Sequence, residues 1–297
     1  MARLTGRGRR VNTPATLPWR VMSVIDCHAH LWNPGEGFGW IRPGSAHHRA
    51  FSALDLAESG AGCEPAGTVL VEAGRGDAGE TLALRELRLR HPDLIAGYVA
   101  NLQVHGEAGP HRLRALLDES DGARPNGMRL SGPAWEQTPE SARELVPVLA
   151  GAGVALELNL GGGALRTAAE VAAEHPGLTV VVDHLGNPPN LRTGDPGDWY
   201  RDAERAAALP NVVVKISGLL TQQHGVPADR VDRLVRHVTD AFGPARCLVG
   251  SDWPICLPRG SRADSLAAVR RGIAHLSEGR RREVLHTTAA RVYGLRG

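Results

Sequence analysis

Eight short apolar runs rich in β-branched residues recur along the chain, and they constrain its fold more than any other feature. They are residues 21–27, 67–72, 94–100, 127–130, 154–158, 178–183, 212–216 and 246–250. Stretches with helical spacing lie between them, at 80–90, 139–150, 165–175, 198–208 and 229–242. Alternating strands and helices, with strands apolar on both faces, predict a parallel sheet covered by helices. Eight such units predict an α/β fold closed into a (β/α)8 TIM barrel.

A doubly wound open sheet is the alternative fold, but no glycine-rich phosphate loop follows the first apolar run. The length of 297 residues suits one barrel domain. We predict this domain over residues 22–297, because Met22 begins the segment MSVIDCHAHLW, which is a natural start for a first strand. Residues 1–21 are basic and contain Pro14 and Pro18, and we expect either a disordered tail or a misassigned start.

Charge and cysteine content narrow the possible partners. The formal net charge is +2 without a clustered basic stripe, which argues against nucleic acid. No apolar run approaches the roughly 18 residues that a membrane span needs. The four cysteines are scattered, without a C-x-x-C pair, as in a cytoplasmic enzyme with reduced thiols. We therefore expect a small-molecule substrate, and Cys27 and Cys247 to be buried.

Nearly every apolar run delivers a polar residue at its carboxyl end. In a barrel these ends converge on the face where active sites of this fold lie. The H-x-H spacing puts two imidazoles in one pocket, because alternate strand residues share a face. The candidate site residues are His28, His30, Glu72, Arg129, Glu157, Asn159, His184, Lys215, Ser217 and Asp252.

Four of these candidates have the chemistry of a mononuclear metal site. His28, His30, His184 and Asp252 would suffice to hold one divalent cation such as Zn or Mn, which lowers the pKa of bound water to about 7. The alternative is a pocket without an obligatory cofactor, in which the imidazoles polarise a carbonyl directly. Glu157 is left open as a replacement ligand, a substrate contact or the partner of a cation.

The sequence resembles a known family at seven ordered motifs. They are VIDCHAHLWNP, VLVEA, GMRL, VVVDHLGNP, NVVVKISGL, VGSDWP and LHTTAARVYGL. Together they resemble the amidohydrolase-2 (amidohydrolase-related) family, and DHLGNP, KISGL and GSDWP resemble its lactonase branch, which includes L-fuconolactonase, L-rhamnonolactonase and 2-pyrone-4,6-dicarboxylate hydrolase. The resemblance runs from about Met22 to Gly297. The family usually has Asn near Thr288 and often Gln where Glu72 stands.

The resemblance implies a carboxylic-ester hydrolase that opens a small, sugar-type lactone. Asp252 would act as general base, taking a proton from water and returning it to the leaving alkoxide. Several lactonases of this branch work without metal. Binuclear sites of the wider superfamily use a carboxylated lysine and a further histidine, where this chain has Arg129 and Glu157, so a binuclear site is not expected.

Further candidates concern substrate binding. Lys215 is the only lysine in the chain and is expected to contact an oxyanion or to pair with Glu157, as a catalytic or a structural cation. Arg129 is placed to bind a carboxylate or a ring oxygen. Because only the loop arginines Arg75 and Arg259 could add to it, neutral sugar lactones are favoured over dianionic pyrones. Trp32 and Trp40 would stack on a sugar ring or roof the barrel.

Two other reactions and one other class of function fit the same residues. A metal-dependent decarboxylase would share the barrel, the H-x-H motif and the strand-eight aspartate, and amide hydrolysis differs mainly in its poorer leaving group. A catalytically silent barrel that binds a sugar acid is the alternative of another class. Several partly buried charges argue against that silent barrel, because such charges are costly unless they pair fully or act.

Overall fold

The computed structural model describes residues 23–120 and 123–295, in which eight parallel strands form one sheet in the order β1 to β8. The strands are β1 (Ile25–Ala29), β2 (Gly67–Val71), β3 (Ile95–Asn101), β4 (Gly127–Gly132), β5 (Ala155–Leu160), β6 (Val180–Val182), β7 (Val212–Ile216) and β8 (Cys247–Val249). After β8, Asp252 N–H donates to His28 O and His30 N–H donates to Trp253 O, both at 2.8 Å. These bonds bring the two ends of the sheet together, and the predicted barrel is confirmed.

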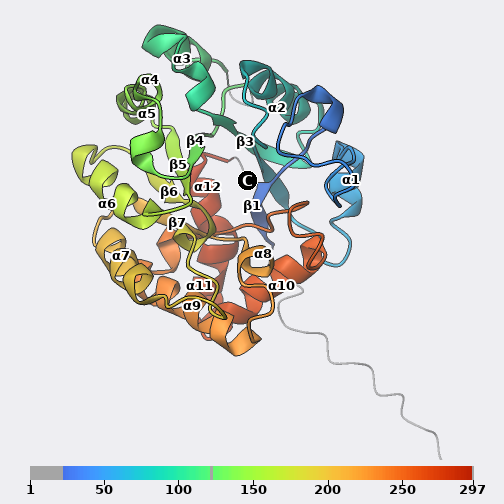
Figure 1. Ribbon diagram of the computed structural model, residues 1–297, viewed down its shortest axis with the longest axis vertical. Helices are drawn as coiled ribbons and strands as arrows, with labels where there is room; N and C mark the ends of the chain where they lie inside the picture. Colours follow the sequence, from blue (N-terminus) through green and yellow to red (C-terminus); the bar gives the residue numbers. More distant parts are fainter. Residues whose placement is uncertain (1–22, 121–122, 296–297) are drawn as a thin grey trace, which may run out of the picture.

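The helices form a ring around the strands (Figure 1). They are α1 (Ala53–Glu58), α2 (Ala78–Arg90), α3 (Gly109–Leu117), α4 (Glu140–Arg143), α5 (Val146–Ala152), α6 (Ala164–Glu174), α7 (Gly197–Ala207), α8 (Leu219–Gln222), α9 (Ala228–Phe242), α10 (Arg262–Gly272), α11 (Glu278–Arg282) and α12 (Thr288–Val292). The single helix expected over 139–150 is wrong, because it divides into α4 and α5. Pro147 has no N–H to donate to the preceding turn, so a new helix begins beside it.

The interior of the barrel has an apolar lower half. It is filled by side chains from seven strands, from α12 and from Tyr293, and α12 lies across the middle of the ring in Figure 1. The members are Ile25, Cys27, Val69, Val71, Val99, Ala155, Val181, Val213, Leu248, Ala289 and Tyr293. Outward-facing side chains such as Leu156 and Leu158 instead pack against the helices. The ionisable residues therefore lie above an apolar base, towards the carboxyl ends of the strands.

Strand β1 departs from simple alternation just before the histidines. Its pairing register with β2 shifts between Asp26 and Ala29. Cys27 belongs to the interior apolar cluster, yet His28, the next residue, also contacts interior side chains. Asp26 points outward and binds Arg262 on α10, with Oδ2 2.8 Å from Nε. Such irregularities redirect side chains locally, and this one turns the H-x-H pair inward.

Cys27 and Cys247 are buried, as predicted, and burial raises the pKa of the Cys247 thiol to about 12. None of the helices within residues 23–120 and 123–295 is long and apolar enough to cross a membrane. The predicted tail at 1–21 lies outside the described residues.

Candidate active site

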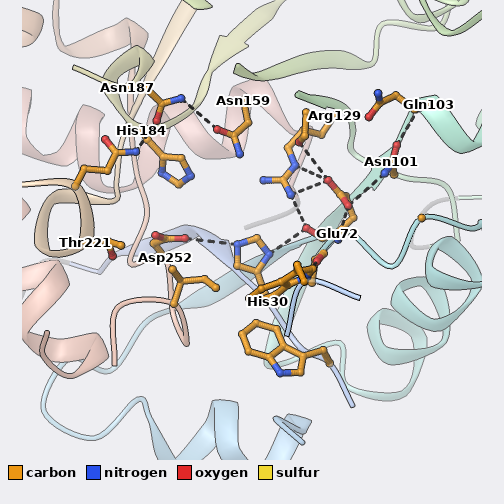
Figure 2. A pocket seen from close by; sticks show the side chains of 18 residues that line it. His30, Glu72, Asn101, Gln103, Arg129, Asn159, His184, Asn187, Thr221 and Asp252 are labelled. Carbon is orange, nitrogen blue, oxygen red and sulfur yellow. Dashed lines mark hydrogen bonds and ion pairs between the residues drawn. The ribbon is translucent and has the colours of Figure 1, made fainter. Parts of the chain in front are cut away.

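A cavity of about 580 Å³ lies at the carboxyl ends of the strands. Eight of the predicted site residues line it: His30, Trp32, Trp40, Glu72, Arg129, Asn159, His184 and Asp252 (Figure 2). His28, Glu157 and Lys215 do not line it, because they lie one layer deeper with no exposed surface. The predicted candidates thus divide into a pocket wall and a buried floor.

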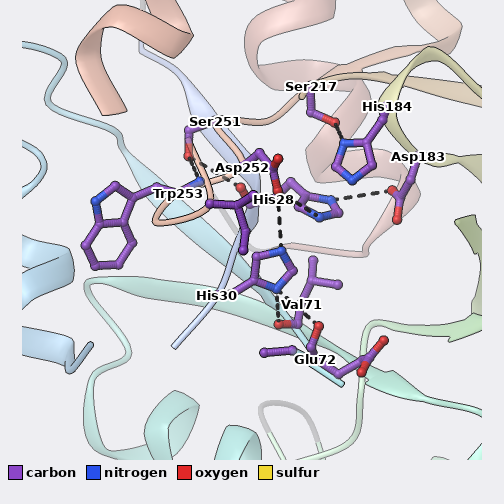
Figure 3. Close-up of polar contacts among 12 residues, drawn as sticks. His28, His30, Val71, Glu72, Asp183, His184, Ser217, Ser251, Asp252 and Trp253 are labelled. Carbon is purple, nitrogen blue, oxygen red and sulfur yellow. Dashed lines mark hydrogen bonds and ion pairs between the residues drawn. The ribbon is translucent and has the colours of Figure 1, made fainter. Parts of the chain in front are cut away.

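Three histidines surround the Asp252 carboxylate (Figure 3). Its Oδ1 lies 3.5 Å from His30 Nε2 and 3.8 Å from His28 Nε2. The ring centroids of His28 and His184 are 4.5 Å apart, and those of His28 and His30 are 4.8 Å apart. Residues from β1, the turn after β6 and the turn after β8 therefore form one cluster, which we call the histidine cluster.

Backbone carbonyls set the proton position on His30. Its Nδ1 lies 2.9 Å from Val71 O and 3.1 Å from Glu72 O. Carbonyl oxygens only accept, so Nδ1 carries a hydrogen and Nε2 is the ring nitrogen that faces Asp252. His184 Nδ1 lies 2.8 Å from Ser217 Oγ, which orients the ring of His184 in the same cluster.

Left-handed backbone turns aim two members of the cluster. His184 has φ +52° and Asp252 has φ +59°. Asp and His are among the residues that tolerate this region best, so these turns can carry functional side chains. Gly250 lets β8 approach β1, since a Cβ there would lie 2.4 Å from His28 Cβ. The sequence alone gives the residue types but not these directions.

The histidine cluster fits a divalent cation. One ligand atom each from His28, His184 and Asp252 lie within 4.8 Å of one another, and ligands of a tetrahedral zinc ion lie about 3.4 Å apart. His28 Nε2 is buried without a hydrogen-bond partner. An unpartnered imidazole nitrogen beside a carboxylate is what an absent cation would leave, so these residues allow one.

The floor beneath the cluster is ionic. Lys215 Nζ lies 2.7 Å from Glu157 Oε2, 2.9 Å from Asp183 Oδ1 and 3.2 Å from His28 Nδ1. Tyr293 donates its hydroxyl to the other oxygen of Glu157. His28, Glu157 and Asp183 also have metal-ligating atoms close together, but the Lys215 ammonium already supplies the cation there. We call Lys215, Glu157 and Asp183 the buried triad.

Burial and neighbouring charges shift the pKa values of the site. Burial lowers the pKa of His28 well below its ordinary value, and it lowers that of His184 as well, so both rings are neutral at pH 7. Burial opposes ionisation of Asp252, but His184 and His30 together bring its pKa below the ordinary value. Burial also opposes ionisation of Asp183, but Lys215 and His28 hold its pKa well below the ordinary range. Asp252 is therefore an ionised base beside neutral imidazoles.

We expect acid to destabilise the protein in a window that begins near the ordinary pKa of histidine, about 6.5. The unfolded chain binds protons at His28 and His184 in this window, whereas the folded protein, with lowered pKa values, takes them only at lower pH. Unfolding then takes up protons, so the free energy of unfolding falls as the pH decreases. Urea denaturation of chelator-treated protein at about pH 7.5 and 5.5 measures this. The variant His28→Asn should show a weaker pH dependence, and an equal dependence in both proteins would contradict the assignment.

Arg129 and Glu72 form a buried pair on the pocket wall (Figure 2). Arg129 Nη2 lies 2.6 Å from Glu72 Oε1, and Arg129 Nε lies 2.7 Å from the same oxygen. Arg129 Nη1 also lies 3.6 Å from Asp183 Oδ2. The loop candidates Arg75 and Arg259 do not line the cavity, and Arg75 pairs with Asp77.

A relay of side-chain amides forms the opposite wall, and sequence analysis did not find it. Asn187 Nδ2 donates to Leu160 O at 2.7 Å and to Asn159 Oδ1 at 3.3 Å, while Gln222 donates to Asn187 Oδ1. The backbone carbonyl can only accept, so it fixes the direction of the whole relay. Asn159 is left with its N–H donors facing the cavity. Asn187 stands in the DHLGNP motif, which was the one available signal.

The aromatic residues have separate roles. Trp32 is buried and donates to His47 O at 3.0 Å, and its ring meets that of Trp40 edge to face with centroids 5.3 Å apart. Trp40 is 42 % exposed and lines the cavity. Trp40 therefore offers a ring surface to a ligand, supported from below by Trp32.

Comparisons with known proteins cover nearly the whole described chain. Residues 25–295 match the profile of the family described as Amidohydrolase. An L-fucono-1,5-lactonase of Burkholderia multivorans is 27% identical over 309 residues, covering 91% of this chain and 96% of the relative. An L-fucono-1,5-lactonase of Burkholderia ambifaria is 29% identical, covering 81% and 83%. A crystal structure of a Burkholderia multivorans amidohydrolase with bound zinc has a TM-score of 0.77 at 26% identity, covering 92% of this chain and 100% of that one.

Proposed function

Because this chain belongs to the amidohydrolase family, we propose that it hydrolyses a small lactone of the sugar type, with Asp252 as general base. The observation that carries the proposal is the histidine cluster, where the Asp252 carboxylate, with a lowered pKa, lines the cavity beside three imidazoles. The lactonase names of two relatives supply the class of substrate.

The reaction needs one proton to move twice. Asp252 removes a proton from water as the water oxygen bonds to the lactone carbonyl carbon, which leaves a tetrahedral oxyanion. The ring C–O bond then breaks, and Asp252 returns the proton to the leaving alkoxide. The product is a hydroxy acid, which releases one proton to solvent at neutral pH. His30 Nε2 lies 3.5 Å from the Asp252 carboxylate and helps to hold its position, and His184 lines the same part of the cavity.

A divalent cation would be held by His28, His184 and Asp252, with His30 Nε2 as a fourth donor. When bound, it would polarise the lactone carbonyl and acidify water. Lys215 and the other residues of the buried triad would keep His28 in place with or without the cation.

The cavity suits a neutral, hydroxyl-bearing ring. Its volume of about 580 Å³ is in the range of small-molecule sites. Asn159 offers N–H donors, Asn101 and Gln103 add further amides, and Trp40 offers a flat apolar surface on which a sugar ring stacks. This mixture supports a sugar lactone better than an aromatic or long apolar ester.

Proton release from a panel of aldonolactones tests the proposal. Purified protein is treated with chelator and assayed with a pH indicator, alone and after addition of zinc or manganese. Proton release that survives chelation supports direct action of the histidine cluster on the lactone. Proton release that is lost on chelation and restored by metal identifies the histidine cluster as a set of metal ligands. Silence under both conditions, in protein that is folded by circular dichroism, would overturn the proposal and favour decarboxylation, amide hydrolysis or ligand binding alone.

A further inference from the structure

Arg129 is the single lysine or arginine among the described residues that line the cavity, yet all three of its nitrogens already face protein acceptors. Nε and Nη2 both meet Glu72 Oε1, and Nη2 also donates to Glu72 O at 2.7 Å. Nη1 faces Asp183 at 3.6 Å. Glu72 thus engages the Nε hydrogen and both Nη2 hydrogens, so neither edge of the guanidinium keeps the two free donors that a bidentate ligand carboxylate would need.

Glu72 is fixed in this position. Its other oxygen, Oε2, accepts from Gly74 N at 2.7 Å and lies 3.4 Å from Asn101 Nδ2. The side chain is almost fully buried, with 1% of its surface exposed. Both carboxylate oxygens are therefore held in place, and this position keeps Glu72 against Arg129.

The charges around the cavity reinforce the effect. Four carboxyl groups lie around the two cations Arg129 and Lys215. They are those of Glu72, Glu157, Asp183 and Asp252. Burial raises the pKa of Glu157, and even with a proton on Glu157 the acids outnumber the cations. An anionic ligand therefore meets an excess of negative charge. The surroundings have a low dielectric constant, which strengthens the repulsion.

We propose that Glu72 sets the charge selectivity of this site by masking Arg129, so that the pocket accepts an uncharged ester and rejects carboxylates. The masking of Arg129 does not depend on the proposed function, but its consequence for turnover does. Hydrolysis converts a neutral lactone into a hydroxy acid whose carboxyl group loses a proton to solvent. The masked arginine would then favour the substrate over its own product, and Glu72 would be a specificity residue that also speeds product release.

Carboxylate binding tests the masking directly. Titration calorimetry on chelator-treated protein uses two probes, gluconate and glutarate, so that no metal contributes to the affinity. Glu72→Gln keeps the shape of the side chain but removes its charge, and we expect both anions to bind about 10- to 100-fold tighter than to the parent protein, the range of a hydrogen bond to a charged group. Glu72→Gln/Arg129→Gln should lose this gain. Glu80→Gln removes a nearby buried carboxyl that binds Ala73 N and Arg75 N instead of Arg129, and it should leave anion binding weak.

Three results would overturn the inference: unchanged anion affinity in folded Glu72→Gln, equal affinity in the single and double variants, or an equal gain in Glu80→Gln. The same variants also separate this inference from the proposed function. If the parent protein hydrolyses no lactone but Glu72→Gln gains anion binding, the masking stands and the reaction fails. If lactones are hydrolysed, gluconate should inhibit Glu72→Gln about 10-fold more strongly than the parent.

Discussion

Asp252→Asn is expected to lower kcat for lactone hydrolysis about 10³-fold, within the range that general-base catalysis contributes. The amide has the size of the carboxylate but cannot take a proton from water at neutral pH. The left-handed backbone at φ +59° tolerates Asn as well as Asp. Folding should therefore be retained, and the loss should appear in kcat measured by proton release under saturating lactone.

A second His–Asp pair on the outside of the barrel provides the matched control. Asp240 on α9 lies 3.8 Å from His275 Nε2, the same separation as between Asp252 and His28, but its side chain is 65% exposed. Asp240→Asn makes the same chemical change away from the cavity and should leave kcat unchanged. If Asp252→Asn retained more than about a tenth of the activity, another group would have to be the base.

Lys215→Met is expected to reduce the free energy of unfolding by about 3–5 kcal/mol at neutral pH. The substitution leaves Glu157 and Asp183 facing each other in a fully buried layer without their ammonium, and Arg129, 3.6 Å from Asp183, compensates only one of them. Urea denaturation followed by circular dichroism measures the change. The loss is large because folded domains are stable by only about 5–15 kcal/mol.

An exposed ion pair provides the control for Lys215→Met. Arg233 on α9 lies 2.8 Å from Asp229, and both side chains are more than half exposed. Arg233→Met should lower the free energy of unfolding by no more than about 0.5 kcal/mol.

The pH dependence of stability provides a second check on Lys215→Met. Asp183, whose pKa Lys215 and His28 hold down against burial, stabilises the parent above the ordinary aspartate pKa of about 3.9 and loses this effect as the pH falls. In the variant the carboxyl protonates earlier, so the two proteins should converge in acid. Equal stability at neutral pH would mean that the buried triad shares a proton instead of holding full charges.

The strands and their order could be predicted from sequence, because each is a short apolar run covered on both faces. The face of most polar residues could be predicted as well, but their depth could not. Glu157 and Asn159 share one face of β5, yet Glu157 lies in the buried floor and Asn159 in the pocket wall. Alternation along a strand gives direction, whereas depth depends on how far each strand extends through the barrel.

Other parts of the site depend on local backbone geometry that composition does not encode. The register shift in β1 turns both Cys27 and His28 inward. The amide relay joins Asn187, in the turn after β6, to Gln222 at the end of α8, so it does not follow from strand pairing. Asp183 was expected only as a strand end, but in the structure it links Lys215, His28 and Arg129.

The left-handed turns at His184 and Asp252 also limit how this site can evolve. At both positions the backbone admits few side chains at low cost, chiefly Gly, Asn, Asp and His. The proposed chemistry and the backbone conformation therefore both restrict these positions to the same few residue types. Most substitutions there would disturb the reaction and the local fold together. New chemistry on this scaffold is therefore more accessible at pocket residues in ordinary backbone conformations than at His184 and Asp252.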